Sequence, residues 1–140
     1  MNVVTPTTEQ VYELRVRATP EQVWDAITKP EVTSRYYGGT SVENTHDRHR
    51  AWENGVLSHE SPTLVWEPSR RLVHGWCSLC DPERAAEEES RVTWEIEPLA
   101  DGTTKLTVTH DRLESSPLTA ANVSAGWPVV LEGLKRLLDA

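Results

Sequence analysis

Two histidines, His74 and His110, could take part in acid–base chemistry because both are predicted to face the interior of the fold. Each shares the apolar face of an alternating stretch, residues 72–77 and 105–110, so both are predicted to point into the fold. A buried imidazole can orient a polar ligand atom or act as a general acid or base near neutral pH. More often it makes a structural hydrogen bond. No Ser, Thr or Cys stands at a recognisable nucleophile elbow, so the pair are candidates for a general base only.

The aromatic content points to a binding cavity. The chain has six Trp and three Tyr but no Phe. Large rings with one polar tip suit small-molecule sites, although they also pack as ordinary core. Tyr36 and Tyr37 precede Gly38-Gly39 and are expected at the mouth, and Trp52 and Trp66 are less clearly inward than the other indoles. The predicted ligand-binding residues are Trp24, Tyr36, Tyr37, Trp52, Trp66, His74, Trp76, Trp94, His110, Trp127 and Leu131.

His74, Cys77 and Cys80 have a spacing that could suggest a metal site. A single CxxC without a second cluster indicates little, and positions 74, 77 and 80 of one strand do not face the same way. CSLC also does not open a helix, which argues against a redox pair. We therefore expect no metal and no cofactor, with both cysteines as free thiols.

Composition limits the class of protein. The 140 residues, 37% apolar and 26% charged with a mean hydropathy of -0.53, suit one globular domain over residues 1–140, with residues 1–10 as a flexible N-terminus. The net charge of -8 disfavours nucleic acid. No apolar run is long enough for a membrane span, and no secretory signal opens the chain, so a cytoplasmic location is expected.

Alternating patterns predict the sheet that must carry these side chains. Residues 11–18 form a half-buried strand, and Asn54-Gly55 and Asp101-Gly102 mark turns. The segment HDRHR, residues 46–50, is interpreted as a turn or a solvated strand end, and residues 81–90 as a solvated loop. Further strands are predicted at 40–45, 64–66, 72–77, 91–96 and 105–110.

Helical signals occur after the first strand and at the C-terminus. Thr19, Pro20 and Gln22 form a capping box that starts a short helix, which Lys29-Pro30 ends, and residues 31–35 add another turn. Apolar residues at helical spacing in 126–140 predict the longest helix. Pro128 lies either in its first turn or after an earlier helical piece near residues 119–125. Strands followed by a segregated helix indicate an α+β fold.

Several stretches resemble a known superfamily. YELRVRATPEQVWDAITKPE is similar to the start of SRPBCC proteins, the helix-grip fold that includes START lipid-transfer domains and the birch-pollen allergen. WEPSRRLVHGW, SRVTWEIEPLADGTTKLTVTHDRLE and GWPVVLEGLKRLL resemble the branch named after the activator of heat-shock protein 90 ATPase. The resemblance implies a curved antiparallel sheet of about seven strands around a long C-terminal helix, with two short helices after strand one.

Three functions remain open from the sequence. The first is binding of a small hydrophobic or amphipathic molecule, such as a lipid, an aromatic metabolite or a polyketide-like compound, between sheet and C-terminal helix. The second is an enzyme of the cyclase or hydratase kind that uses His74 or His110 as base. The third is a chaperone-linked or regulatory interaction module, for which a homodimer or a chaperone is the expected partner.

Overall fold

The computed structural model describes residues 9–79 and 82–140. The elements follow one another as β1 (Gln10–Val16), α1 (Pro20–Thr28), α2 (Pro30–Thr33), β2 (Thr40–Asn44), β3 (Arg48–Glu53), β4 (Val56–Glu67), β5 (Arg71–Trp76), α3 (Pro82–Ala85), β6 (Ser90–Pro98), β7 (Thr104–Asp111) and α4 (Pro117–Asp139). The predicted α+β helix-grip fold, with short helices after strand one, is thereby confirmed.

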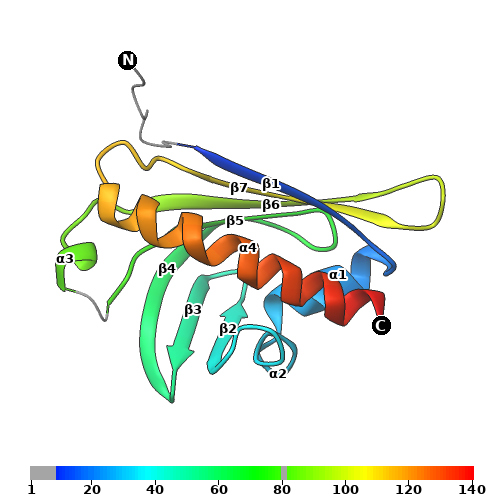
Figure 1. Cartoon of the computed structure of the whole chain (residues 1–140), viewed down its shortest axis with the longest axis horizontal. Coiled ribbons are helices and arrows are strands. Elements are labelled where there is room, and N and C mark those ends of the chain that lie inside the picture. The colour runs from blue at the N-terminus through cyan, green and yellow to red at the C-terminus, as the bar shows by residue number, and fades with distance from the viewer. Residues whose placement is uncertain (1–8, 80–81) are drawn as a thin grey trace.

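A single antiparallel sheet forms the body of the molecule. Its order is β1-β7-β6-β5-β4-β3-β2, so β1 closes one edge beside β7 and the remaining strands follow as successive hairpins. The sheet curves strongly, and β2, β3 and β4 turn away from the plane of β5, β6 and β7 (Figure 1). Helix α4 crosses the concave face, with α1 beside its C-terminal half (Figure 1).

The short helices form as the sequence predicts. Thr19 accepts a hydrogen bond from the Gln22 backbone N–H, and the Gln22 side chain accepts one from the Thr19 N–H, which completes the capping box of α1. Helix α1 buries Val23 and Ile27 against the sheet. The Lys29 and Pro30 pair ends α1 and starts α2 at once.

Helix α4 resolves the alternatives left open for Pro128. The helix runs from Pro117 to Asp139 with Pro128 inside it, so the piece near residues 119–125 and the C-terminal piece are one element. Pro128 has no N–H to give to the Ser124 carbonyl. Both residues are exposed, so water can serve that carbonyl instead. The Lys135 ammonium donates to the Arg15 carbonyl at 2.7 Å and holds the far end of α4 against β1.

Two local interpretations of the sequence are corrected. Residues 46–50 include a turn, but His49 belongs to β3 and is only 2% exposed, because inward and outward residues alternate from Arg48 onward. Residues 81–90 are not wholly a solvated loop, since α3 covers Pro82–Ala85 and Ser90 is buried in β6. Glu87 also caps α4, where its carboxylate accepts from the Leu118 and Thr119 backbone N–H groups at 2.9 and 2.8 Å.

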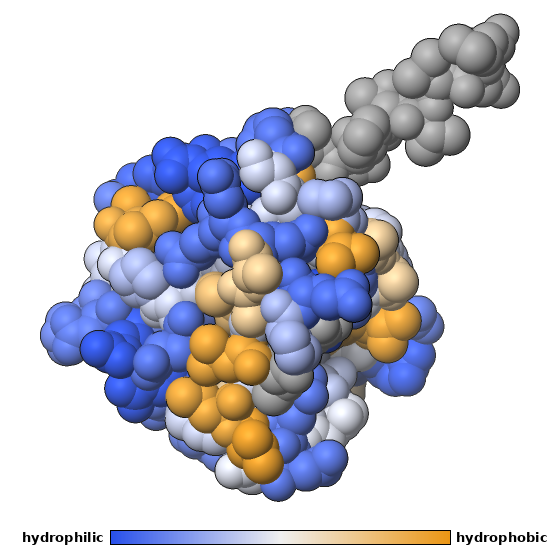
Figure 2. All heavy atoms as spheres, turned by 90° about the vertical axis from the view of Figure 1, so that its left-hand side faces the viewer, coloured by the Kyte–Doolittle hydropathy of each residue, from blue (hydrophilic) through white to orange (hydrophobic). Residues whose placement is uncertain are grey.

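The N-terminus joins the sheet at β1, directly after the start of the described residues. Residues 1–8 of the expected flexible N-terminus lie outside them, while Gln10 already belongs to β1 and donates to the Ala120 carbonyl at 3.0 Å. No helix in the described ranges is long and apolar enough to cross a membrane. The face at the start of α4 is mostly hydrophilic, with apolar side chains gathered in separate groups (Figure 2).

Candidate functional site: a cavity between sheet and helix

A cavity of about 220 Å³ lies between α4 and the strands β2 to β5. Its wall is mainly apolar, with polar groups from several elements among the apolar ones. The lining residues are Tyr37, Thr40, Val42, Ala51, Glu53, His59, Trp76, Asn122, Val123, Gly126, Trp127 and Val130. The position matches the hollow that the resemblance implied between sheet and C-terminal helix.

Local sequence explains why space remains there. Inward positions elsewhere in the sheet carry branched apolar residues such as Leu72, Leu106 and Val108, which fill the interior. At the cavity, β3 contributes Ala51 and α4 contributes Gly126, whose small side chains leave the volume between them open. The indoles of Trp76 and Trp127, with ring centroids 5.8 Å apart, form one wall.

His74 is a structural histidine in the wall behind the cavity. It is fully buried, its Nδ1 lies 2.7 Å from the Gly75 carbonyl, and its Nε2 accepts from Trp94 Nε1–H at 3.0 Å. Because an indole N–H can only donate, Nε2 carries the lone pair and Nδ1 the proton. The pKa of His74 is lowered to about 4, chiefly by burial; the bond to the Gly75 carbonyl opposes this shift and the nearby His59 adds to it.

His110 forms a second indole–imidazole pair. Trp127 Nε1–H donates to His110 Nδ1 at 3.0 Å, so the proton of the neutral ring lies on Nε2 and is given to Ser90 Oγ at 2.7 Å. This direction is opposite to that of a hydrolase dyad, in which the imidazole accepts the serine proton. Burial lowers the pKa of His110 to about 3, with His74 adding to the shift. Ser90 is therefore not an activated nucleophile here.

His49 stacks on His74 with ring centroids 3.9 Å apart and an interplanar angle of 5°. Asn44 fixes its ring, because the Asn44 amide donates to the Ile27 carbonyl at 2.7 Å and its Oδ1 faces His49 Nδ1, also at 2.7 Å. Nδ1 therefore carries the proton, and Nε2 is a buried acceptor with no partner among the described residues. Burial, followed by the neighbouring His74, His59 and His110, lowers the pKa of His49 well below its ordinary value.

His59 is the one histidine of this group that lines the cavity. Its ring lies 4.7 Å from the Trp76 ring, and its Nδ1 is 3.2 Å from Ser58 Oγ. Burial lowers the pKa of His59 to about 4, and Arg84 adds to the shift. At neutral pH the cavity wall therefore presents an uncharged imidazole. Burial also raises the pKa of Tyr37, whose phenol stays protonated.

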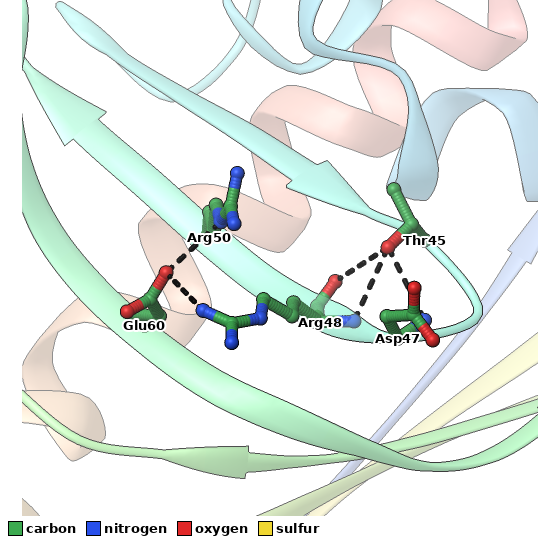
Figure 3. A network of polar contacts seen from close by, with 5 residues as sticks. All are labelled: Thr45, Asp47, Arg48, Arg50 and Glu60. Carbon is green, nitrogen blue, oxygen red and sulfur yellow. Dashed lines mark hydrogen bonds and ion pairs between the residues drawn. The ribbon is translucent and has the colours of Figure 1, made fainter.

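The outer face of the β3–β4 hairpin fixes the strands that carry His49 and His59. Glu60 accepts from Arg48 at 2.8 Å and from Arg50 at 3.0 Å, which ties the two strands together (Figure 3). Thr45 Oγ1 accepts from the backbone N–H groups of Arg48 and Asp47 in the preceding turn (Figure 3). The inward residues of β3 and β4 are thereby held in a defined register.

The structure places the predicted site residues in three groups. Tyr37, Trp76 and Trp127 line the cavity. A second group packs in the core next to it, namely Trp24, Trp66, His74, Trp94, His110 and Leu131, with Trp24 and Trp66 in edge contact at 4.8 Å. Tyr36 and Trp52 form the third group. Tyr36 donates its hydroxyl to the Ala26 carbonyl, and Trp52 lies between the cavity-lining Ala51 and Glu53, on the opposite face of β3.

Sequence reasoning missed His49, His59, Asn44 and Ser61. Alternation in 48–53 could have identified His49 as inward, because His49 and Ala51 are two residues apart and so lie on the same face of a strand. His59 was harder to find, since β4 contains a register shift and no clean alternating pattern. Nothing in the sequence signals that Asn44 reaches back to the carbonyl of Ile27 in a helix.

The cysteine and metal predictions fall partly outside the described residues. Cys77 is a partly exposed free thiol, while Cys80 lies outside the described ranges. Burial raises the pKa of the Cys77 thiol, and Glu89 adds to this shift. Within residues 9–79 and 82–140, no group of three or more His, Cys, Asp or Glu side chains is arranged to hold a metal ion.

Comparison with protein families gives one match over most of the chain. A family profile described as "Activator of Hsp90 ATPase homolog 1-like protein" matches residues 17–139. A comparison with curated proteins finds no match. The resemblance drawn from the sequence is therefore confirmed at the level of the family.

Solved structures agree with this fold. Protein MLL2253 from Mesorhizobium loti has a TM-score of 0.74 at 24% identity, over 94% of this chain and 96% of that one. DynU16, titled a putative protein in the dynemicin biosynthetic locus, has a TM-score of 0.72 at 23% identity, over 96% of this chain and 48% of that one. The Aha1 dimer from Colwellia psychrerythraea has a TM-score of 0.72 at 14% identity, over 94% and 96%. At these identities the likeness shows the fold alone.

Proposed function

Because the chain belongs to the family of activator of Hsp90 ATPase homolog 1-like proteins and has a cavity beneath its long helix, we propose that it binds a small hydrophobic or amphipathic molecule there. The observation that carries this proposal is the apolar space walled by Trp76 and Trp127. Burial of an apolar ligand against two indoles supplies the driving force, at roughly 25 cal/mol per Å² removed from water.

The size of the cavity narrows the ligand class. At about 220 Å³ it is smaller than the ~300–1,000 Å³ pockets that hold drug-sized ligands. A one-ring aromatic molecule or a short acyl chain fits this volume better than a whole lipid. The likeness to DynU16, named for a biosynthetic locus, is consistent with an aromatic metabolite or a fragment of polyketide type.

Polar groups at the wall would set the orientation of the ligand. Tyr37 offers a phenol, His59 an uncharged imidazole and Asn122 an amide from α4. These groups lie on different sides of the cavity, because they come from the segment after α2, from β4 and from α4. A ligand with one polar end can meet one of them while its apolar part faces the indoles.

Binding is better supported than the cyclase or hydratase alternative. His74 and His110 use both ring nitrogens in hydrogen bonds to other groups of the chain. Neither has a free lone pair for a substrate proton, which a general base needs. An interaction role has less support too, because the exposed large apolar side chains of the described residues are spread over β1, β4, the segment after β5 and α4, and those within one element are at least eight positions apart. They are Val11, Val56, Leu64, Leu79, Leu118 and Val129.

The test is a binding titration with a cavity-filling variant. Small aromatic compounds and short acyl chains are screened by quenching of Trp fluorescence, and hits are measured by calorimetry. Ala51→Leu places a larger side chain in the cavity and is expected to weaken binding at least tenfold. Ala125→Leu makes the same enlargement at an exposed position of α4 and should leave affinity unchanged. Equal affinity of the two variants, or no binding by the wild type, would contradict the proposal.

A further inference from the structure

The row of side chains directly behind the cavity is polar and incompletely bonded. In the sheet register, Val42 pairs with Ala51 and Ala51 with His59, and all three line the cavity. The next inward row, two residues along each strand, consists of Asn44, His49 and Ser61. Two residues of a strand span about 6.5 Å, so this row adjoins the cavity floor.

Two atoms of this row lack partners among the described residues. His49 Nε2 and Ser61 Oγ are both buried without a hydrogen bond, on residues that are 2% and 3% exposed. Asn44 and the Ile27 carbonyl fix the proton of His49 on Nδ1, so Nε2 can only accept. Ser61 is the direct cross-strand neighbour of His49, which places their Cβ atoms about 5 Å apart.

Trp76 contacts both this row and the cavity. Its ring lies 5.6 Å from the His49 ring and also lines the cavity. Trp94 and Trp127 are fixed by hydrogen bonds from their indole N–H groups, whereas Trp76 makes no side-chain hydrogen bond to any described residue. Its ring is therefore held by packing against neighbouring rings and the hydrophobic core, and no hydrogen bond has to break for it to turn.

We propose that His49 and Ser61 form the inner polar end of the ligand site, and that the ligand is a small ring compound with one hydroxyl group. The hydroxyl donates to His49 Nε2 and accepts from Ser61 Oγ, while Trp76 turns to admit it. An unpaired buried acceptor is costly, and a hydroxyl is the smallest ligand group that can serve an acceptor and a donor together. This inference rests on the proposed function, because it specifies the ligand of the same cavity.

A pair of nearly isosteric probes tests the inference. p-Cresol and p-xylene differ by a hydroxyl in place of a methyl group, so cavity filling is equal and only the polar contact differs. Calorimetry gives the ratio of their dissociation constants for the wild type, His49→Phe and Ser61→Ala. His49→Phe is expected to reduce the preference for p-cresol about fivefold to tenfold, and Ser61→Ala about threefold. His46→Phe, at an exposed turn residue, is the matched control and should leave the ratio unchanged.

A measurement on the wild type covers the case in which His49→Phe does not fold. The imidazole ¹⁵N resonance of His49 Nε2 should shift when p-cresol binds and stay in place with p-xylene. If both probes bind but neither the ratio nor the resonance responds, the inference is wrong and the proposed function stands. If neither probe binds the wild type, while other apolar compounds do in the fluorescence screen, the hydroxyl-ring class is wrong. Absence of any binding overturns both.

Discussion

The two ends of the space under α4 are built from different kinds of residue. At one end, which we call the packed end, Val16, Val23, Ile27, Leu72, Leu106 and Leu134 are buried together where α1 closes the sheet. At the other, the cavity end, the lining side chains surround open space, and buried histidines stand behind them. The same sheet and helix thus support a filled core and a hollow, and the difference lies only in the inward side chains.

The difference teaches how this fold stabilises an incomplete core. The packed end relies on burial of branched apolar side chains, which is non-directional. The cavity end relies in part on directed bonds: Trp127, which lines the cavity, donates to His110, and Trp94 donates to His74 in the layer behind the cavity. Directed bonds can keep a cavity open where apolar packing alone would collapse into it. They also make that end dependent on the protonation state of the histidines.

The largest expected difference between the two ends is their response to acid, which should destabilise the cavity end first. The pKa values of His59 and His74 are about 4 and that of His110 about 3, all below the ordinary value of 6.5. Between these values the unfolded chain binds more protons than the folded one. The stability that depends on keeping these histidines neutral is therefore fully present above about pH 6.5. As the pH decreases toward 4, the free energy of unfolding falls by about 1.4 kcal/mol per pH unit for each such histidine.

Protonation also breaks two hydrogen bonds. The protonated rings of His74 and His110 carry N–H groups on both nitrogens and can no longer accept from the indole N–H groups of Trp94 and Trp127. We expect unfolding before pH 4, followed by circular dichroism. Hydrogen exchange at about pH 5.5 should show earlier loss of protection in β3 and β4, which carry His49 and His59, than in α1 at the packed end, which contains no histidine. A His59→Leu variant should move the acid midpoint to lower pH, and the exposed His46→Leu should not. An acid midpoint that does not change in the His59→Leu variant would contradict this account.

Truncation of one apolar side chain at each end sharpens the comparison. Leu72 is fully buried at the packed end, and its change to Ala leaves a void, so we expect a loss of about 3 kcal/mol in the free energy of unfolding. Val130 borders the cavity and is only partly buried, so Val130→Ala should cost less than about 1 kcal/mol. Urea denaturation of both variants measures the difference. Similar losses would indicate that the cavity end is packed as tightly as the core.

The sequence predicts the packed end well because periodicity reports apolar burial. Alternation in 72–77 and 105–110, together with helical spacing near the C-terminus, identifies Leu72, Leu106 and Leu134 as inward, and all three are fully buried. The capping box at Thr19 is likewise a local signal, since both of its bonds join residues three apart.

The cavity end is predicted less well because its features depend on contacts between distant residues. His49 stands in the polar segment HDRHR, and only its pairing with Asn44 and its stacking on His74 show it to be interior. Trp52 was a candidate for the site, yet its neighbours Ala51 and Glu53 line the cavity, so it falls on the other face. Whether a volume is filled or open is set by packing in three dimensions, which periodicity does not report.

The smallest expected effect concerns the start of α4, the part of the helix that covers the cavity. Ser116, its N-cap residue, provides no side-chain capping bond, and Glu87 from the segment before β6 takes that role by accepting from Leu118 and Thr119. Burial raises the pKa of Glu87, but the Thr119 hydroxyl, these backbone bonds and the nearby Arg84 together outweigh it and lower the pKa below its ordinary value. The carboxylate also lies at the positive end of the helix dipole.

Glu87→Gln keeps an acceptor but removes the charge, so we expect a loss of under about 1 kcal/mol in global stability. Hydrogen exchange in residues 120–123 should rise while exchange in the last turns of α4 stays the same, because Lys135 holds those turns independently through the Arg15 carbonyl. Glu88→Gln makes the same change at the exposed neighbouring position and serves as the matched control. Uniform loss of protection along α4 would mean that the helix responds as one unit and that the cavity end has no separate anchor.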